Sequence, residues 1–247
     1  MSTATPLRPF TAFHRSKIDW SHRFQQLAAK AHFPALQQFY EAGVVPEKTP
    51  IKDVPLLAMD FETTGLNPSI DDIVSIAVIP FTLSSIQVAA GKYWVLKPAA
   101  DLQHTSIAIH GITHTEVEQA PDFEMIAVQL LEQMQGRILL VHHQGIERRF
   151  LNTAMLKRFG EGIEFPCIDT MALEARLHRQ SPSGLFNQII RPQTRVSIRL
   201  PESRARYHLP HYTAHHAKID ALACAELFQA QIAHHYSAGT PLSQLWC

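Results

Sequence analysis

The alternation of hydrophobic and polar positions along the chain predicts a mixed sheet covered by helices. Short apolar runs rich in β-branched and aromatic residues indicate strands. They occupy residues 56–62, 73–81, 86–96 and 138–141, with a further strand ending near Ile168. Apolar residues at helical spacing indicate helices, at residues 126–134, 147–159, 171–178 and 217–235. The first three strands have short connections, so we expect an antiparallel meander within an α/β fold whose mixed β-sheet is flanked by helices.

The first 50 residues carry a helical pattern of their own. Trp20, Phe24 and Leu27 recur at helical spacing, and a second short helix ends near Gly43. A linker with prolines at positions 46, 50 and 55 follows. We therefore divide the chain into an N-terminal helical extension, a main domain and a C-terminal tail, at residues 1–50, 55–236 and 237–247. We expect the extension to pack on the main domain or on a partner chain.

Composition and charge are those of an ordinary globular protein. Lys and Arg together number 22, as do Asp and Glu, so the chain has no overall basic excess, although a local groove can still bind nucleic acid. Cys167, Cys224 and Cys247 form no CxxC pair, which argues against a zinc ribbon or a disulfide framework. No segment has the pattern of a signal peptide or a membrane span. We therefore expect a cytoplasmic protein with reduced thiols that does not bind membranes.

The strand at residues 56–62 ends in two carboxylates, Asp60 and Glu62, shortly before the turn residue Gly65. Side chains alternate along a strand, so Asp60 and Glu62 project side by side while Phe61 points into packing on the other face. Two carboxylates this close repel, and each raises the pKa of the other. Mg²⁺ or Mn²⁺ bound by the oxygens removes this penalty. The alternative is an ordinary strand end whose acids are solvated.

A second acidic position opens the helix at residues 217–235. Asp220 lies in its first turn, where the helix dipole favours an anion. His215 comes five residues earlier, on the loop before the helix, where it is free to move over a site and to act as a general base near neutral pH. His216 is the competing choice. The alternative is a pair of solvent-exposed histidines beside a helix-capping acid.

A third acidic position follows the short apolar strand at residues 138–141, which we expect to be central because it is apolar throughout. After this strand comes a polar turn, and Glu147 then starts a helix near the same edge of the sheet. The alternative is a solvated acid at a helix start, or one that pairs with Arg148 or Arg149.

These segments occur in the order of three motifs of a known family. The Asp60-x-Glu62-Thr63-Thr64-Gly65 motif, the segment 140–151 and the His215-x-x-x-x-Asp220 motif together resemble the DEDDh exonucleases, the group of the proofreading epsilon subunit of bacterial DNA polymerase III. Two further segments look like parts of this family, His110-Gly111-Ile112-Thr113 and Ile168-Asp169-Thr170. The resemblance covers about residues 55–236. The middle motif departs from the family, because Glu147 stands where the family usually has Asp.

The resemblance implies a ribonuclease H-like fold and a 3′–5′ exonuclease that hydrolyses phosphodiester bonds with two Mg²⁺ or Mn²⁺ ions. It implies that the ions are held by four carboxylates, Asp60, Glu62, Glu147 and Asp220, with His215 as general base. It also implies a substrate site made by Phe61, Thr63, Thr64, Gly65, Leu66 and His142, with Glu62 and the Thr63–Thr64 backbone at the terminal 3′ hydroxyl. The expected partner is a single-stranded 3′ end, of DNA in the first place. A homodimer or a polymerase-type partner is also compatible with this picture.

Three alternatives remain open from the sequence. The chain is an RNA or short-oligonucleotide exonuclease, or a binding module of the same fold that Glu147 has left slow or inactive. A third reading is a metallohydrolase of another fold that uses the histidines His142, His143, His208, His211, His215 and His216, although it lacks HExxH. Finally, arginines before the third motif are expected either to line a path for the phosphate backbone or to form a solvated face, namely Arg191, Arg195, Arg199, Arg204 and Arg206, with Tyr207 beside them.

Overall fold

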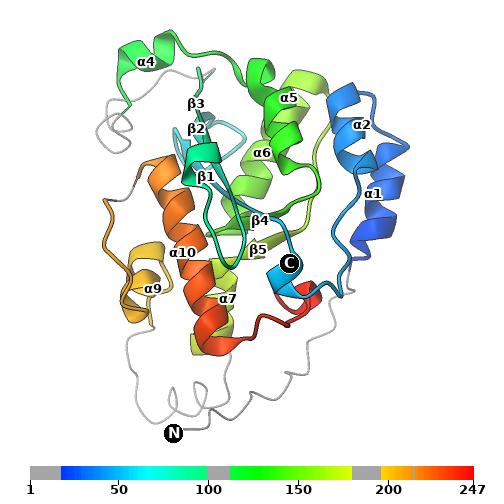
Figure 1. Ribbon diagram of the computed structural model, residues 1–247. Coiled ribbons are helices and arrows are strands. Elements are labelled where there is room, and N and C mark those ends of the chain that lie inside the picture. Colours follow the sequence, from blue (N-terminus) through cyan, green and yellow to red (C-terminus); the bar gives the residue numbers. More distant parts are fainter. Residues whose placement is uncertain (1–17, 99–111, 180–195, 214) are drawn as a thin grey trace, which may run out of the picture.

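The computed structural model describes residues 18–98, 112–179, 196–213 and 215–247 (Figure 1). Five strands form one sheet, β1 (Leu56–Thr63), β2 (Ile73–Phe81), β3 (Lys92–Val95), β4 (Ile138–Val141) and β5 (Cys167–Asp169), in the order β3-β2-β1-β4-β5. β1, β2 and β3 pair antiparallel, which confirms the predicted meander, and β4 and β5 run parallel to β1. β4 is an interior strand, but the middle of the sheet is β1.

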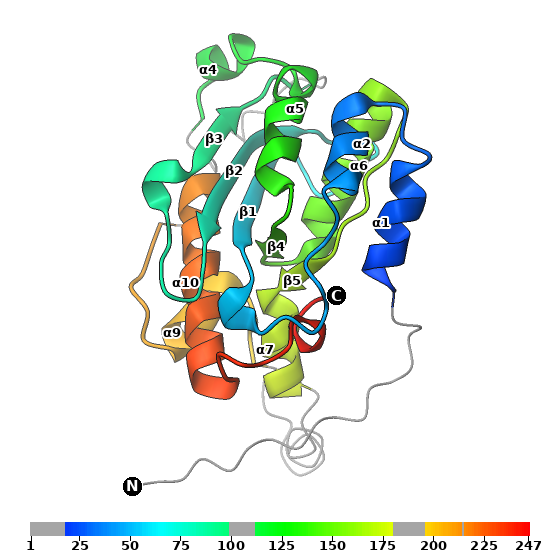
Figure 2. The same ribbon diagram turned by 45° about the vertical axis from the view of Figure 1, so that its right-hand side comes forward.

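Helices cover both faces of this sheet, as Figure 2 shows. One face carries α5 (Phe123–Met134) and α6 (Gln144–Phe159), which contact each other. The other face carries α10 (Ala217–His235), which packs on β1, β2 and β4 and has α7 (Thr170–Arg179) and α9 (Leu200–Arg206) beside it. This arrangement confirms the predicted mixed sheet flanked by helices. It also brings the end of β1 between the first turns of α6 and α10.

The third strand is shorter than the sequence indicates. The expected strand at residues 86–96 contains a 3₁₀ turn, η2 (Val88–Ala90), and only β3 remains as regular strand. Gly91 follows this turn, at a point where its backbone lies close to that of Val78 on β2. A Cβ there would lie 3.1 Å from the carbonyl oxygen of Val88 and 3.2 Å from that of Val78, so a side chain would force a shift of backbone.

The N-terminal helices and the C-terminal segment pack on the main domain. α1 (Trp20–Ala28) and α2 (Pro34–Glu41) bury Trp20, Phe24 and Phe39 in the same core as the sheet. The linker turn η1 (Ile51–Asp53) pairs with the chain around η3 (Leu242–Gln244), since the Ile51 amide donates to the carbonyl of Thr240 at 2.9 Å. The division into an extension, a domain and a tail stays a sequence-based prediction.

Two short helices are missing from the sequence prediction. α4 (His114–Glu118) begins with a capping box in which Thr113 and Glu116 satisfy each other's backbone amides, a pattern that Thr-x-x-Glu signals. α9 starts after Arg199 with Pro201 in its first turn. In the ranges that the structure describes, no helix has the length and apolar character needed to cross a bilayer.

Candidate active site

Three carboxylates converge where β1 leaves the sheet. Asp60, Glu62 and Asp220 each place an oxygen within 4.8 Å of the other two. Asp60 and Glu62 share one face of β1, as predicted from their spacing, and Phe61 is buried in the core from the other face. Asp220 comes from α10, which is far away in sequence. The structure therefore brings the first and third sequence motifs together.

The start of α10 holds Asp220 and His215 in a fixed relation. His216 is the N-cap residue, and its Nδ1 accepts a hydrogen bond from the Lys218 amide at 3.3 Å. His215 has left-handed backbone geometry, with φ of 72°, which turns its amide toward the helix. This amide donates to Oδ2 of Asp220 at 2.8 Å. His215 itself is exposed, beside the three carboxylates rather than within the helix.

Glu147 lies in the first turn of α6 and is almost fully buried, with 3% of its surface exposed. Within the described part of the chain its Oε2 has no hydrogen-bond partner. Neither neighbouring arginine pairs with it. Arg148 instead donates to the Gln144 side chain at 2.6 Å, and Arg149 donates to the Gly145 carbonyl. The predicted alternative of a Glu147–arginine pair is therefore wrong.

Asp169, at the end of β5, fixes the first turn of α6. It accepts hydrogen bonds from the backbone amides of His143 at 3.0 Å and Gln144 at 3.1 Å, and also from the Met171 amide at 2.9 Å. One buried carboxylate thus caps both α6 and α7. The sequence indicates the cap of α7, but the link to α6, and so to Glu147, depends on the parallel pairing of β4 and β5.

His142 is partly buried just after β4. The Thr170 hydroxyl donates to the Val141 carbonyl at 3.1 Å, and its Oγ1 lies 2.8 Å from His142 Nδ1. Burial lowers the pKa of His142 to about 4, against the opposing charge of Asp169. At neutral pH the ring of His142 is therefore uncharged. Its role toward a substrate stays a prediction.

Burial and neighbouring charges oppose the ionisation of Asp60, Glu147 and Asp220. Burial raises the pKa of Asp60 well above its usual range, and the charges of Glu147, Asp220 and Glu62 raise it further. Burial also raises the pKa of Glu147, with Asp169 adding to the shift. It raises that of Asp220 against the hydrogen bond from the His215 amide. A buried set of oxygen donors, one of them without a partner, fits Mg²⁺ or Mn²⁺.

We expect added Mn²⁺ to stabilise the folded chain more strongly as pH rises. The raised pKa values of Asp60, Glu147 and Asp220 mean that the folded chain binds these protons more tightly than the unfolded chain. Their stabilising contribution is present below the unfolded pKa values and is lost as pH rises through the folded ones. Cation binding offsets this loss. The measurement is the melting temperature with Mn²⁺ or with chelator, from about pH 5 to about pH 8.

The same series on Asp60→Asn isolates the site from other titrating groups. This variant lacks one of the repelling charges, so the gain from Mn²⁺ should be smaller and should vary less with pH. A gain from Mn²⁺ that is equal in the two proteins at every pH would show that the ion binds elsewhere.

The turn after β1 is built from hydrogen bonds among its own side chains. Thr63 Oγ1 donates to the Gly65 carbonyl at 2.6 Å, and Thr64 Oγ1 accepts from the Asp72 amide at 3.0 Å. The Asp71 carboxylate occupies the space beside Gly65, where a Cβ would come within 2.5 Å of it. A side chain at position 65 would therefore push the Asp71 carboxylate away from the Asn67 amide that it accepts from, and the two threonines shape the turn.

Two apolar side chains of this turn remain at the surface. Leu66 is 75% exposed and Ile70 is 70% exposed. Phe61 lies on the opposite face of β1 in the core, so it supports the turn from behind rather than facing the three carboxylates. Of the two apolar residues assigned to a substrate site, Leu66 is the one available for contact.

The structure corrects the expected arginine path. Arg204 is buried and pairs with Glu226 at 2.8 Å, and Arg206 pairs with the buried Glu174. Both guanidinium groups therefore stabilise the packing around α9 and α10. Arg191 and Arg195 lie outside the described residues. Arg199, at the N-cap of α9, is the one expected arginine in the described ranges that is exposed.

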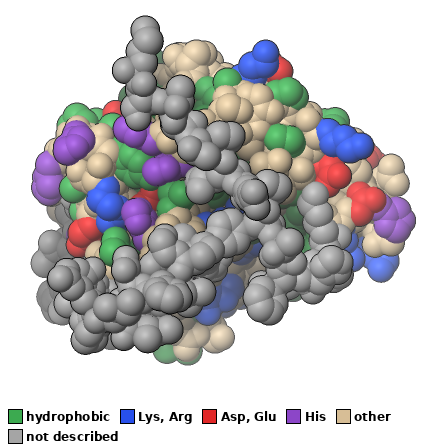
Figure 3. All heavy atoms as spheres, turned by 90° about the horizontal axis from the view of Figure 1, so that it is seen from below, with side chains coloured by type: hydrophobic (Ala, Val, Ile, Leu, Met, Phe, Trp, Pro, Cys, Tyr) green, Lys and Arg blue, Asp and Glu red, His purple; other side chains and the backbone are tan. Residues whose placement is uncertain are grey.

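The six histidines of the alternative metal site form no ligand group of their own among the described residues. Seen from below, several histidine side chains gather on one side of the molecule (Figure 3). His234 contacts the ring of Tyr207 with 5.3 Å between centroids, and His178 lies 3.3 Å from Glu174. Over the residues that the structure describes, the one group of potential ligands close enough for a metal is the carboxylate set, which contains no histidine. The alternative of a histidine-based metallohydrolase is therefore not supported.

Comparison with known sequences identifies related proteins. The sequence model of the Exonuclease family, RNase_T, matches residues 57–228. A DNA polymerase III subunit epsilon of Treponema pallidum is 27% identical over 182 residues, which cover 74% of this chain and 78% of that protein. A PolC-type DNA polymerase III of Thermotoga maritima is 30% identical over 125 residues, which are 51% of this chain and only 9% of that much longer protein.

Solved structures share the fold. The nuclease domain of 3′hExo, described as a DEDDh family member bound to rAMP, superposes with a TM-score of 0.59 at 17% identity, covering 72% of this chain and 92% of that one. The cell-death related nuclease CRN-4 gives a TM-score of 0.59 at 18% identity, with 76% and 66% covered. These likenesses confirm the predicted ribonuclease H-like fold. The matches in sequence confirm the resemblance to epsilon-type exonucleases of DNA polymerase III.

Proposed function

Because the chain belongs to the exonuclease family, we propose that it removes nucleotides from the 3′ end of DNA by metal-assisted hydrolysis. The observation that carries this proposal is the convergence of Asp60, Glu62 and Asp220, with His215 held beside them by its bond to Asp220. An exposed apolar side chain, Leu66, borders the same strand end. Carboxylate ligands beside a histidine that can accept a proton support metal-assisted hydrolysis.

Each residue has a proposed role. Asp60, at the centre of the set, would bridge two ions, Glu62 and Asp220 would hold the first, and Glu147 would support the second. Two bound divalent ions supply charge stabilisation for the attacking and leaving oxygens. His215 would accept the proton of the attacking water, for which its exposed position is suitable. The Asp220–His215 hydrogen bond keeps the base next to the ligand set.

The position of Glu147 bears on the choice between an active enzyme and a binding module. Its carboxylate is outside the group of three within 4.8 Å, yet its charge acts on Asp60 from the first turn of α6. We propose that the longer side chain still serves the second ion. The buried oxygen without a partner supports this role, because such an atom is costly unless a ligand satisfies it.

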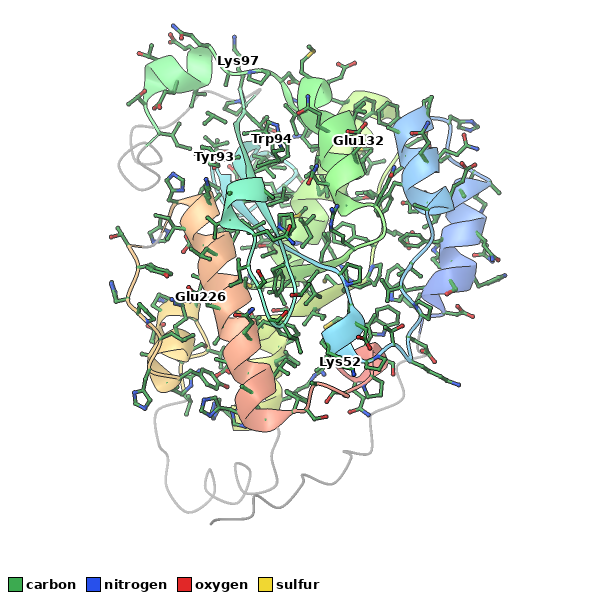
Figure 4. All side chains as sticks on the ribbon, viewed as in Figure 1. Lys52, Tyr93, Trp94, Lys97, Glu132 and Glu226 are labelled. Atoms are coloured by element: carbon green, nitrogen blue, oxygen red, sulfur yellow. The ribbon has the colours of Figure 1, made fainter. Side chains whose placement is uncertain are left out.

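We expect Glu147→Gln to lower the rate about 10- to 100-fold, the range for groups that support a metal-ligand set. Glu147→Asp keeps the carboxylate and the charge, so it should retain most of the activity. Glu147→Gln should also raise the melting temperature of the metal-free protein, because it removes a buried charge. Glu132→Gln, exposed on α5, is the control (Figure 4). Full activity of Glu147→Gln would show that the Glu147 carboxylate is not needed to support the second ion.

The choice of DNA follows from the sequence relatives, which are named as DNA polymerase III components. The test is digestion of matched 5′-labelled DNA and RNA oligonucleotides with Mn²⁺, with product lengths resolved. A ladder that shortens from the 3′ end, on DNA faster than on RNA, is the expected result. Faster digestion of RNA would indicate that the protein recognises the 2′-hydroxyl group. Absence of products from both, with retained binding, would establish a non-catalytic module.

Assembly with a polymerase also stays a proposal. The named relatives include an epsilon subunit and a segment of a PolC-type polymerase. Sedimentation of the purified chain alone would determine whether it forms a homodimer.

A further inference from the structure

Tyr93 connects the edge of the sheet to the start of α10. It lies on β3 opposite Ala77, and Ala77 lies opposite Asp60 on β1. Residues that face each other across paired strands point to the same side of a sheet, so Tyr93 projects on the side of Asp60. Figure 4 shows Tyr93 near the end of α10 at which the helix begins. The edge strand β3 therefore places a side chain next to the site, in addition to those from β1 and α10.

The ring of Tyr93 stacks on that of His216. Their centroids are 5.1 Å apart, and the planes are inclined by only 23°. Burial raises the pKa of the Tyr93 hydroxyl, and the nearby carboxylates of Glu116 and Glu62 raise it further, against a contact with Ser75. The phenol is therefore half-buried between β2 and α10. It contacts His216 on one side and lies close to Glu62, a proposed metal ligand.

His216 is already committed to two structural contacts. It caps α10 through Nδ1, and it stacks on Tyr93. His215 precedes it in a left-handed conformation, with φ of 72°, which non-glycine residues rarely adopt. Such a conformation persists only where the surroundings determine it. Contacts that act on this stretch include the cap, the stack, the amide bond to Asp220, and the bonds that the His216 carbonyl accepts from the Ile219 and Asp220 amides.

We propose that Tyr93 is a positioning residue, which holds the His215–His216 segment over the carboxylates by stacking on His216. This inference rests on the proposed function, because it assigns Tyr93 an action through the proposed base. A stacked aromatic pair is favourable beyond the area that it buries. Its loss would change how often an exposed loop residue occupies a working position, and small displacements reduce rates strongly.

The test compares Tyr93→Ala with Tyr93→Phe. Tyr93→Ala should lower kcat about 10- to 100-fold, while KM and the affinity for Mn²⁺ stay within about twofold. Tyr93→Phe keeps the ring and should restore kcat. Trp94→Ala is the matched control, because Trp94 lies opposite Ile76 and so points to the other face of the same strand. It removes an aromatic side chain of similar burial and should lower the melting temperature without lowering kcat.

A double variant shows whether Tyr93 acts through the histidine. In the background of His215→Asn, Tyr93→Ala should cause no further loss, since both changes remove the same contribution. An equal loss in both backgrounds would overturn the proposal, as would a full kcat for Tyr93→Ala or a parallel loss of Mn²⁺ affinity. His215→Asn with full activity would instead contradict the proposed function.

Histidine resonances in an NMR spectrum provide a readout that needs no catalysis. Tyr93→Ala should shift the ring signals of His216, which lose the stacked neighbour, and should also shift or broaden those of His215. Trp94→Ala should change neither. If His216 shifts while His215 keeps its signal, the stack does not position the base, and the proposal is wrong.

Discussion

Replacing Asp60 with Asn is expected to lower the rate of 3′ nucleotide release about a thousandfold or more. Asp60 lies at the centre of the carboxylate set, and its charge is opposed by those of Glu62, Asp220 and Glu147. Bound ions contribute several kcal/mol to the stabilisation of a phosphoryl-transfer transition state, and about 1.4 kcal/mol corresponds to a factor of ten. Without this carboxylate, neither proposed ion has its shared ligand.

The same substitution should make the metal-free protein more stable. Asn has nearly the same shape as Asp and carries no charge, so it relieves repulsion at a buried position. For a chain of this size, 1 kcal/mol corresponds to about 2 to 4 °C in melting temperature. A variant that melts higher and has lost activity cannot be explained by misfolding. The measurements are thermal unfolding with chelator and single-turnover digestion with Mn²⁺.

Glu132→Gln removes a carboxylate on the other side of the sheet and is the charge-matched control. It should leave both rate and metal binding unchanged. Wild-type activity in Asp60→Asn would remove the basis of the proposed mechanism, because the central ligand would then be dispensable. A lower melting temperature for Asp60→Asn in chelator would show that the Asp60 carboxylate has a stabilising partner in the folded chain.

Local sequence was sufficient for part of this site. The i, i+2 spacing of Asp60 and Glu62 determines that they share a face once the strand is identified. Asp220 was predictable as a first-turn acid because the many apolar residues between Ala217 and Ile232 indicate a long helix that begins just before it. That Asp220 meets Asp60 does not follow from spacing. It came from the order of the family motifs, and the structure explains it by the packing of α10 on β1.

Other features depend on contacts between distant segments. No periodicity marks Tyr93 as part of the site, because its role depends on the register of β3 against β2 and on where α10 begins. Arg204 lies in a polar stretch of sequence that suggests an exposed side chain. In the structure it is buried, where it forms an ion pair with Glu226. Tertiary ion pairs of this kind cannot be recognised from composition, and they make an arginine-rich stretch resemble a nucleic-acid groove.

His215→Asn is expected to lower kcat about 10²- to 10⁴-fold, the usual contribution of a positioned general base. Asn is the suitable replacement because it tolerates the left-handed backbone that His215 adopts, with φ of 72°. The amide bond to Asp220 is made by the backbone and should persist. The affinity for Mn²⁺ should therefore stay unchanged. The dependence of kcat on pH should also become weaker, since the proposed proton acceptor is gone while the carboxylates remain.

His216→Phe separates the two adjacent histidines. Phe keeps a ring that can stack on Tyr93, but it has no nitrogen to accept a proton or to cap α10. Loss of the cap should cost about 1 kcal/mol of stability and lower the melting temperature accordingly. Because the ring still holds the segment, kcat should remain within a few-fold of the native value. The reverse result, with His215→Asn active and His216→Phe inactive, would identify His216 as the base. His215 would then have no catalytic role.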